Sequence, residues 1–167
     1  MTVSTDNLSF LGADDVNAFE ELLREFVTDT GALCTMLVDR TGRLLAEAGD
    51  TGALDVVAFA SLASADFAAS DQLAALLGEQ EFKSLYHHGA ERSMFLAEIG
   101  GAAILAALFD TRTTLGMVRI TTKSLVPRFA ECFARLAERG PSGQVVHMET
   151  GWANEAESEI DRLFSDE

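Results

Sequence analysis

The side chains that could carry out chemistry are few, and their spacing matches no known catalytic or metal site. His87 and His88 are adjacent, so a β-strand would direct them to opposite faces of a sheet, and His147 stands alone. Cys34 and Cys132 lack a metal or redox spacing, which indicates small core residues in a reducing compartment. The chain also has no GxxxxGK phosphate loop, GxSxG elbow or HExxH motif. We therefore predict no catalytic residue, metal site or cofactor of its own.

The chain is acidic in both its main part and its C-terminal segment. Its 167 residues include 27 Asp and Glu but only 12 Lys and Arg, a net charge of -15. Nucleic acids and anionic membranes bind clustered cations, so both are disfavoured as partners. The N-terminus has no basic region followed by an apolar one, and the longest apolar run, residues 100–109, is about half as long as a bilayer-spanning helix. These features predict a cytoplasmic protein.

Helices and strands that position these side chains are predicted from periodicity. Apolar residues at three- and four-residue spacing indicate helices, and short apolar runs between turn residues indicate strands. Asp39 and Gly42 delimit a tight hairpin, because Asp accepts hydrogen bonds from the nearby backbone and Gly tolerates positive φ. We expect helices over residues 13–29, 54–77 and 113–138, the last kinked at Pro127, and strands over residues 32–38, 43–48, 82–88, 93–99 and 102–109.

Strands in runs of two and three, separated by one helix, favour an antiparallel sheet over repeated βαβ units. The run at residues 102–109 is apolar at every position, so we expect it in the centre of the sheet with helices on both faces. The predicted fold is a three-layer α/β/α domain with a five-stranded antiparallel sheet. We expect a flexible arm at 1–12, the domain at 13–139, a linker at 140–151 and an amphipathic acidic tail helix at 152–167.

The helix predicted at residues 54–77 has an outer side without long charged side chains. Winding the sequence at 100° per residue gathers there Ser61, Ser64, Ala65, Ala68, Gln72 and Ala75. Small side chains allow another chain to approach closely, so this side is a candidate contact surface. The alternative is an exposed alanine-rich face that serves helix propensity alone. On the opposite side we expect core residues, namely Phe59, Leu62, Ala63, Phe67, Ala69, Leu73 and Leu77.

The C-terminal segment combines negative charge with an apolar stripe. Ile160, Leu163 and Phe164 fall at i, i+3 and i+4, and Trp152 and Ala156 extend the same helical face upstream. The last 26 residues contain seven acidic residues and one arginine. We expect the stripe to be covered, either by the chain's own domain or by another protein.

The element order and several motifs resemble the Roadblock/dynein light chain family. The motifs include VDRTGRLL at the first hairpin, FDTRTTLGMVR before the last helix and IDRLFS in the tail, and the resemblance covers residues 16–137. The family is a compact domain with a five-stranded antiparallel sheet between helices, and it commonly forms homodimers that seat small GTPases. Within it, the sequence is most similar to the MglB-like branch, bacterial polarity proteins of gliding motility that stimulate GTP hydrolysis by the Ras-like GTPase MglA.

The resemblance implies roles for the central helix and the edge strand. In such dimers the two central helices form a platform for one GTPase molecule, which makes Ser61, Ala65, Ala68 and Gln72 the candidate platform here. The alternative is that this side serves the dimer contact alone. The strand at residues 82–88 is the candidate for joining the two sheets.

The resemblance also implies a role for the tail. Trp152, Ile160, Leu163 and Phe164 are expected to dock on the GTPase away from its nucleotide pocket. The alternative is docking on the chain's own domain. The expected location is the bacterial cytoplasm, with enrichment at a cell pole.

The resemblance implies stimulation without a catalytic residue. A slow GTPase lacks a fixed attacking water and positive charge near the phosphate oxygens. Family members remodel the partner's switch region so that the partner's own Arg and Gln become aligned. We therefore expect Arg112 to pair with a nearby acid or to cap its loop, not to act as an arginine finger. Two other functions stay open: a Roadblock adaptor that holds a GTPase or motor complex without accelerating hydrolysis, and a small-molecule sensor of the PAS or GAF type.

Overall fold

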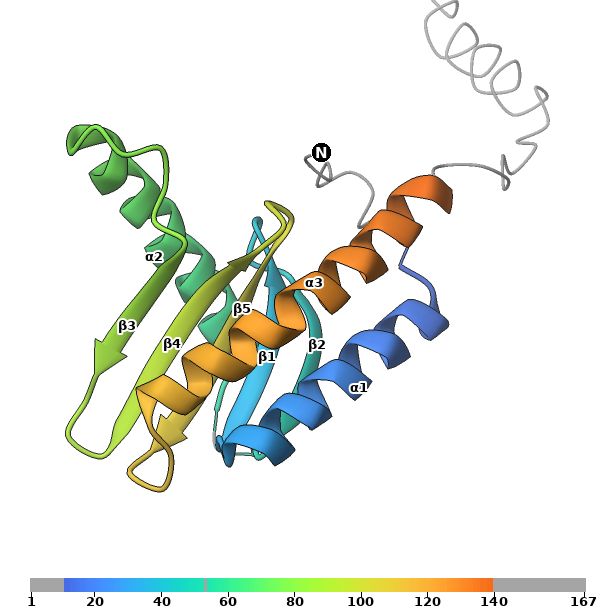
Figure 1. Ribbon diagram of the computed structural model, residues 1–167, viewed down its shortest axis with the longest axis horizontal. Helices are drawn as coiled ribbons and strands as arrows, with labels where there is room; N and C mark the ends of the chain where they lie inside the picture. Colours follow the sequence, from blue (N-terminus) through green and yellow to red (C-terminus); the bar gives the residue numbers. More distant parts are fainter. Residues whose placement is uncertain (1–10, 53, 140–167) are drawn as a thin grey trace, which may run out of the picture.

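The computed structural model describes residues 11–52 and 54–139, so nearly all of the predicted arm, the linker and the tail lie outside the described residues. The order of the elements is the predicted one (Figure 1). They are α1 (Ala13–Thr30), β1 (Cys34–Asp39), β2 (Leu44–Gly49), α2 (Val56–Leu76), β3 (Ser84–His88), β4 (Arg92–Ile99), β5 (Ala103–Asp110) and α3 (Leu115–Arg139).

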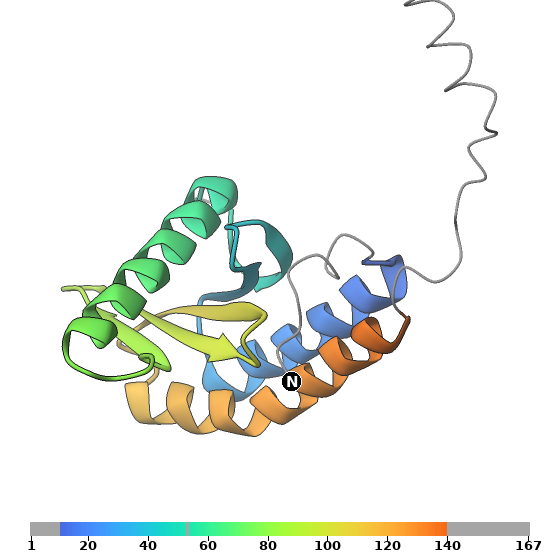
Figure 2. The ribbon, with the colours of Figure 1, turned by 90° about the horizontal axis from the view of Figure 1, so that it is seen from above.

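The strands form one antiparallel, five-stranded sheet with the order β2-β1-β5-β4-β3. β5 lies in the centre and is buried along most of its length, as its apolar sequence predicts. β2 and β3 form the two edges. Figure 2 shows α1 and α3 together on one face of the sheet and α2 alone on the other. The predicted three-layer architecture is confirmed.

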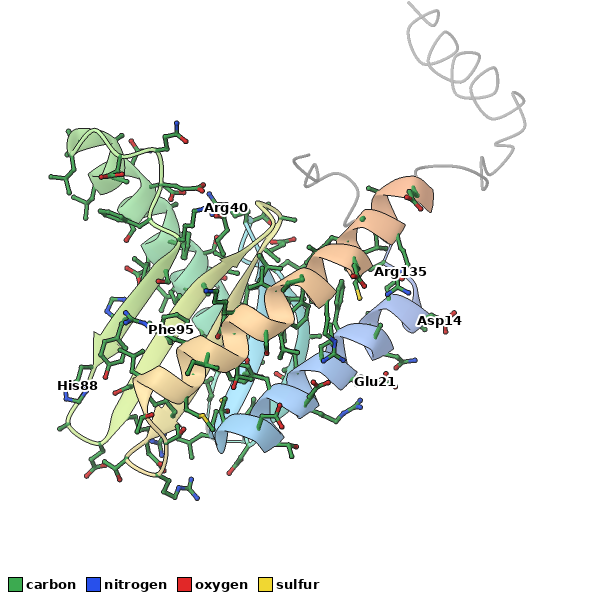
Figure 3. All side chains as sticks on the ribbon, in the orientation of Figure 1. Asp14, Glu21, Arg40, His88, Phe95 and Arg135 are labelled. Atoms are coloured by element: carbon green, nitrogen blue, oxygen red, sulfur yellow. The ribbon has the colours of Figure 1, made fainter. Side chains whose placement is uncertain are left out.

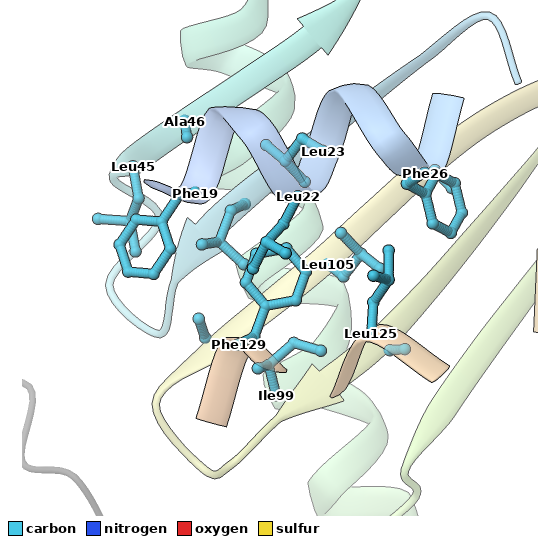
Figure 4. Close-up of a cluster of buried hydrophobic side chains, with 14 of the residues drawn as sticks. Phe19, Leu22, Leu23, Phe26, Leu45, Ala46, Ile99, Leu105, Leu125 and Phe129 are labelled. Atoms are coloured by element: carbon cyan, nitrogen blue, oxygen red, sulfur yellow. The ribbon is translucent and has the colours of Figure 1, made fainter. Parts of the chain in front are cut away.

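The main core lies between the sheet and the pair α1 and α3 (Figure 4). Four phenylalanines there are fully buried: Phe19 and Phe26 of α1, and Phe129 and Phe133 of α3. The ring centroid of Phe19 lies 5.0 Å from that of Phe133 and 6.2 Å from that of Phe129. These aromatic contacts hold the two helices together on the sheet.

The hairpin between β1 and β2 forms as predicted and packs against α2. Asp39 Oδ1 accepts hydrogen bonds from the backbone N–H groups of Thr41 and Arg43, both at 2.9 Å. Gly42 has a φ of 89°, and a Cβ atom there would lie only 3.0 Å from Ser61 Cα. The glycine therefore permits both the turn and the close approach to the helix.

α3 is helical through the segment whose β-branched residues suggest a strand, as expected. Val118 and Leu125 are buried, and the Thr122 hydroxyl donates a hydrogen bond to Val118 O at 2.7 Å. Burial against the sheet and α1 thus outweighs the local propensity. The helix continues through Pro127 to Arg139. No helix in the described part of the chain is both long and apolar enough to cross a bilayer.

Candidate functional site

α2 carries the candidate platform. Asp55 caps its first turn, since its carboxylate accepts a hydrogen bond from the backbone N–H of Ala58 at 3.0 Å. Frequent alanines favour the helix along its 21 residues, and it ends shortly before Gly78, whose φ is 77°. Apolar residues occur around most of its circumference, so periodicity alone does not select the side that faces the sheet.

The inner side of α2 consists of small residues and one phenylalanine. Ser64 was predicted on the outer side but is buried on the inner side. Its hydroxyl donates a hydrogen bond to Arg40 O at 2.7 Å. The guanidinium carbon of Arg40 lies over the Phe67 ring, 5.4 Å from the centroid. The buried residues of the helix are Ala60, Ala63, Ser64, Phe67, Ser70 and Ala74.

Several residues assigned to the core from their spacing are exposed instead. Leu62, Leu73 and Leu77 are 70%, 56% and 72% exposed, and Ala69 is exposed as well. The prediction was wrong because the alanine and serine side of the helix faces the sheet, where the hairpin approaches its backbone closely. Leu73, Leu76 and Leu77 form an exposed apolar surface at the C-terminal end of α2.

The outer side of α2 holds all four platform candidates. Ser61, Ala65, Ala68 and Gln72 are exposed, as expected for a contact surface. The charged residues between them are Asp66 and Asp71, and both are half-buried. Whether this surface contacts a GTPase stays a prediction.

Both acidic residues of α2 are bound to partners on neighbouring elements, and the helix has no basic residue. Asp66 Oδ2 lies 2.7 Å from Nε2 of His87 on β3. Arg40 Nη2 donates to Asp71 Oδ2 at 2.6 Å. These two contacts also tether α2 to the edge strand and to the β1–β2 hairpin. The outer side of the helix therefore carries no unpaired charge.

The edge strand β3 lies next to α2, as the Asp66–His87 contact requires. It pairs with β4, and most of its residues are exposed. His87 and His88 point to opposite faces, as predicted from their adjacency. His88 Nδ1 lies 3.1 Å from both Tyr86 OH and Ser93 Oγ, at the end of the strand (Figure 3). Because β3 is an edge strand, its outer edge is available to pair with another strand.

A group of partly buried charges lies near the C-terminal half of α2, where Figure 3 labels Arg40. Burial raises the pKa of Glu98 on β4; the charge of Glu81 raises it further, whereas that of Arg40 opposes the shift. Asp71 contributes in the same direction as Glu81. Sequence reasoning missed this group because its members come from separate elements and share no local pattern.

Arg112 pairs with a nearby acid, as expected. Its Nε donates to Asp110 Oδ1 at 3.0 Å and to Oδ2 at 2.9 Å, and its backbone N–H donates to Oδ1 at 2.9 Å. The hydrogen bond from the Arg112 side chain lowers the pKa of Asp110, and the same bond raises the pKa of Arg112. The pair closes the loop between β5 and α3.

Both cysteines are free thiols; Cys34 is buried and Cys132 is half-buried. Burial, with smaller contributions from Asp50 and Glu47, raises the pKa of Cys34 to about 11, so its thiol stays protonated at neutral pH. Cys132 packs against the main core. Among the described residues, no group of His, Cys, Asp and Glu is arranged to hold a metal ion.

The four tail candidates, Trp152, Ile160, Leu163 and Phe164, lie outside the described residues. The tail interactions therefore stay predictions from the sequence.

Comparisons with known proteins agree with this architecture. The Roadblock/LC7 domain family matches residues 18–109. MglB of Myxococcus xanthus is 32% identical, with a TM-score of 0.72 over 75% of this chain and 95% of that one. The gliding protein MglB of Thermus thermophilus is also 32% identical, with a TM-score of 0.66 over 78% of this chain and 96% of that one.

A further MglB structure, described as having a tetrameric arrangement, is 31% identical, with a TM-score of 0.69 over 76% of this chain and 95% of that one. No curated relative matches the chain. The family match covers more than half of the sequence, and the chain covers nearly all of the MglB chains. This protein belongs to the Roadblock/LC7 domain family, whose MglB members it resembles in both sequence and fold.

Proposed function

We propose that this chain is a homodimeric regulator that binds a Ras-like small GTPase of the MglA type and stimulates its GTP hydrolysis by remodelling the switch region. The observation that carries the proposal is the outer side of α2, which is exposed, largely apolar and free of unpaired charge. Monomeric proteins rarely leave a contiguous apolar surface of this kind without a binding role. The similarity to MglB chains supplies the class of partner.

The dimer contact uses the C-terminal half of α2 and the adjacent edge strand. Leu76 and Leu77 are 82% and 72% exposed, and Leu73 lies beside them. Covering such side chains stabilises a complex by at most about 1.5 to 3 kcal/mol each. Antiparallel pairing of two β3 strands would join the sheets and bring the two α2 helices together.

The GTPase contact uses the platform residues Ser61, Ala65, Ala68 and Gln72. Their small side chains allow a partner's backbone to approach closely, and the absence of charge avoids a desolvation penalty. Arg112 does not act as an arginine finger in this mechanism, because its side chain is held by Asp110. It acts instead by positioning the partner's own catalytic groups.

The tail is a second docking element of this regulator. Burial of Ile160, Leu163 and Phe164 on the GTPase would contribute about 1.5 to 3 kcal/mol each at best. The ordering of a free segment reduces this gain, which suits a reversible contact. The place of action is the bacterial cytoplasm, with enrichment at a cell pole.

The deciding experiment measures GTP turnover by a purified Ras-like GTPase from the same genome, with and without this protein. We expect acceleration that Ala65→Glu abolishes, because a buried unpaired carboxylate is costly. Ala90→Glu, in the exposed turn between β3 and β4, is the matched control and should retain full stimulation. Arg112→Ala should also retain most of it.

Three results would contradict the proposal. A loss of about a thousandfold with Arg112→Ala would identify an arginine finger. Tight binding without any acceleration would favour the adaptor. Equal behaviour of Ala65→Glu and Ala90→Glu would remove the platform from α2.

A further inference from the structure

The N-terminal half of α3 differs in charge from the rest of this acidic protein. The chain contains 27 acidic residues, yet none lies between Leu115 and Ala130. The same segment contains Arg119, Lys123 and Arg128. It is a local positive region on a protein with a net charge of -15.

The outer side of this segment is also apolar. Val118 and Leu125 face the core. Because a helix rotates by 100° per residue, Ile120 points outward. Ile120 is 70% exposed and Met117 is 46% exposed. We call Met117, Arg119, Ile120 and Lys123 the α3 stripe.

The two cations of the α3 stripe have no carboxylate within ion-pair distance among the described residues. Arg119 lies over the ring of Phe95, 6.0 Å from the centroid. By contrast, Arg128 on the same helix is paired with Glu25 of α1. The stripe thus offers uncompensated positive charge beside exposed apolar side chains.

Residues 152–167 have the complementary composition. In a helix, the i, i+3 and i+4 spacing of Ile160, Leu163 and Phe164 would place them on one face, and Glu157, Glu159 and Asp161 surround them in the sequence. The outer side of α2 is also apolar, but it has no cation to pair with these carboxylates. Charge complementarity therefore selects the α3 stripe.

The length of the chain permits this contact. Ile120 lies about 29 Å along the helix axis from Arg139, where the described residues end. Residues 140–151 can span about 40 Å when extended. The segment can therefore run back along α3 and reach the stripe of its own chain.

We propose that residues 152–167 dock on the α3 stripe of their own chain. Ile160, Leu163 and Phe164 cover Met117 and Ile120, and the neighbouring carboxylates face Arg119 and Lys123. Docking holds the tail on its own domain until a partner competes for it. The contact needs no GTPase, so its test is independent of the proposed function.

The test is amide hydrogen exchange of the full-length protein alone, followed by mass spectrometry of peptides within residues 152–167. A segment docked nine-tenths of the time exchanges about tenfold more slowly than the same peptide when free. We expect this protection at low salt, and a loss of most of it in Lys123→Glu or Ile120→Ser. Added salt should weaken it as well, because the charges are at the surface.

Matched controls separate docking from general changes in charge or hydrophobicity. Lys83→Glu makes the same charge change at an exposed site away from α3, and Leu62→Ser changes a side chain that is also 70% exposed. Both should keep the tail protected. Unchanged protection of β1 and β5 peptides confirms that each variant is folded.

Three outcomes would overturn the proposal. The tail could exchange at the free rate in the unaltered protein. Its protection could be equal in all four variants, which would place the contact elsewhere. Protection could also vanish on dilution, which would place the tail on another copy.

Discussion

Both faces of the sheet hold a buried apolar core: the one beneath α1 and α3, here called the closed face, is larger, and the one beneath α2, here called the open face, lies under a helix with several exposed leucines. On the face covered by α1 and α3, large aromatic side chains are fully buried between two helices and the sheet. On the other face, α2 packs through alanine and serine and directs several leucines outward. A closed layer stabilises the domain itself, whereas an open apolar layer is available to a second chain.

The largest expected effect concerns the closed face. Phe129→Ala removes a fully buried ring that contacts Phe19, so we expect a loss of about 3 to 5 kcal/mol in the free energy of unfolding. Urea denaturation measures the loss. Phe59→Ala, at a half-buried position of α2, should have a clearly smaller effect. Equal losses at the two positions would contradict the distinction between the faces.

The next effect concerns the open face. Leu76→Glu combined with Leu77→Glu should leave the fold intact, because both side chains are exposed. In the proposed dimer each change removes apolar contact and introduces a charge, so we expect the dissociation constant to rise at least about tenfold. Sedimentation over a range of concentrations measures it. Ala134→Glu, at an exposed site on α3 outside the stripe, is the control that should leave the dimer unchanged.

If these leucines instead packed within the single chain, the double change would lower the free energy of unfolding and leave the association state as it was. That result would show that these leucines do not form a contact surface for a second chain.

The smallest effect concerns the charges near α2. Burial raises the pKa of Glu98, so the folded state holds this proton more tightly than the unfolded chain does. The free energy of unfolding therefore falls as pH rises from the ordinary value of 4.5 through the raised pKa. Glu98→Gln removes this dependence and should be the more stable protein at pH 7. Its advantage should shrink as pH approaches 4.5.

Denaturation curves at several pH values measure this difference. Glu21→Gln, at an exposed site on α1, is the matched control and should show no such advantage. A stabilisation of Glu98→Gln that persists unchanged at low pH would mean that burial of the charge is not its cause.

The sequence allowed the closed face to be predicted well. Phe19, Leu22 and Phe26 recur at helical spacing with polar residues between them, so one side of α1 is unambiguous. β5 is apolar at every position before its last residue, Asp110, and could only be central. Asp39 and Gly42 determine the hairpin through local backbone chemistry alone.

The open face was predicted less well, for a physical reason. α2 is apolar on nearly every side, so spacing placed Leu73 and Leu77 inside although they are exposed. The side that packs is chosen by tertiary contacts, such as the bond from Ser64 to Arg40 O. The partners of Asp66 and Asp71 likewise come from distant elements, and no local pattern indicates them.

The inward pairing of Asp66 and Asp71 has a kinetic consequence. Because Asp71 pairs with Arg40 and Asp66 is hydrogen-bonded to His87, α2 presents no free carboxylate to an approaching molecule. Any dependence of the association rate on ionic strength should then come from the net charge of -15 on the whole protein and not from the contact surface itself. Recognition there would be decided by how long the complex lasts.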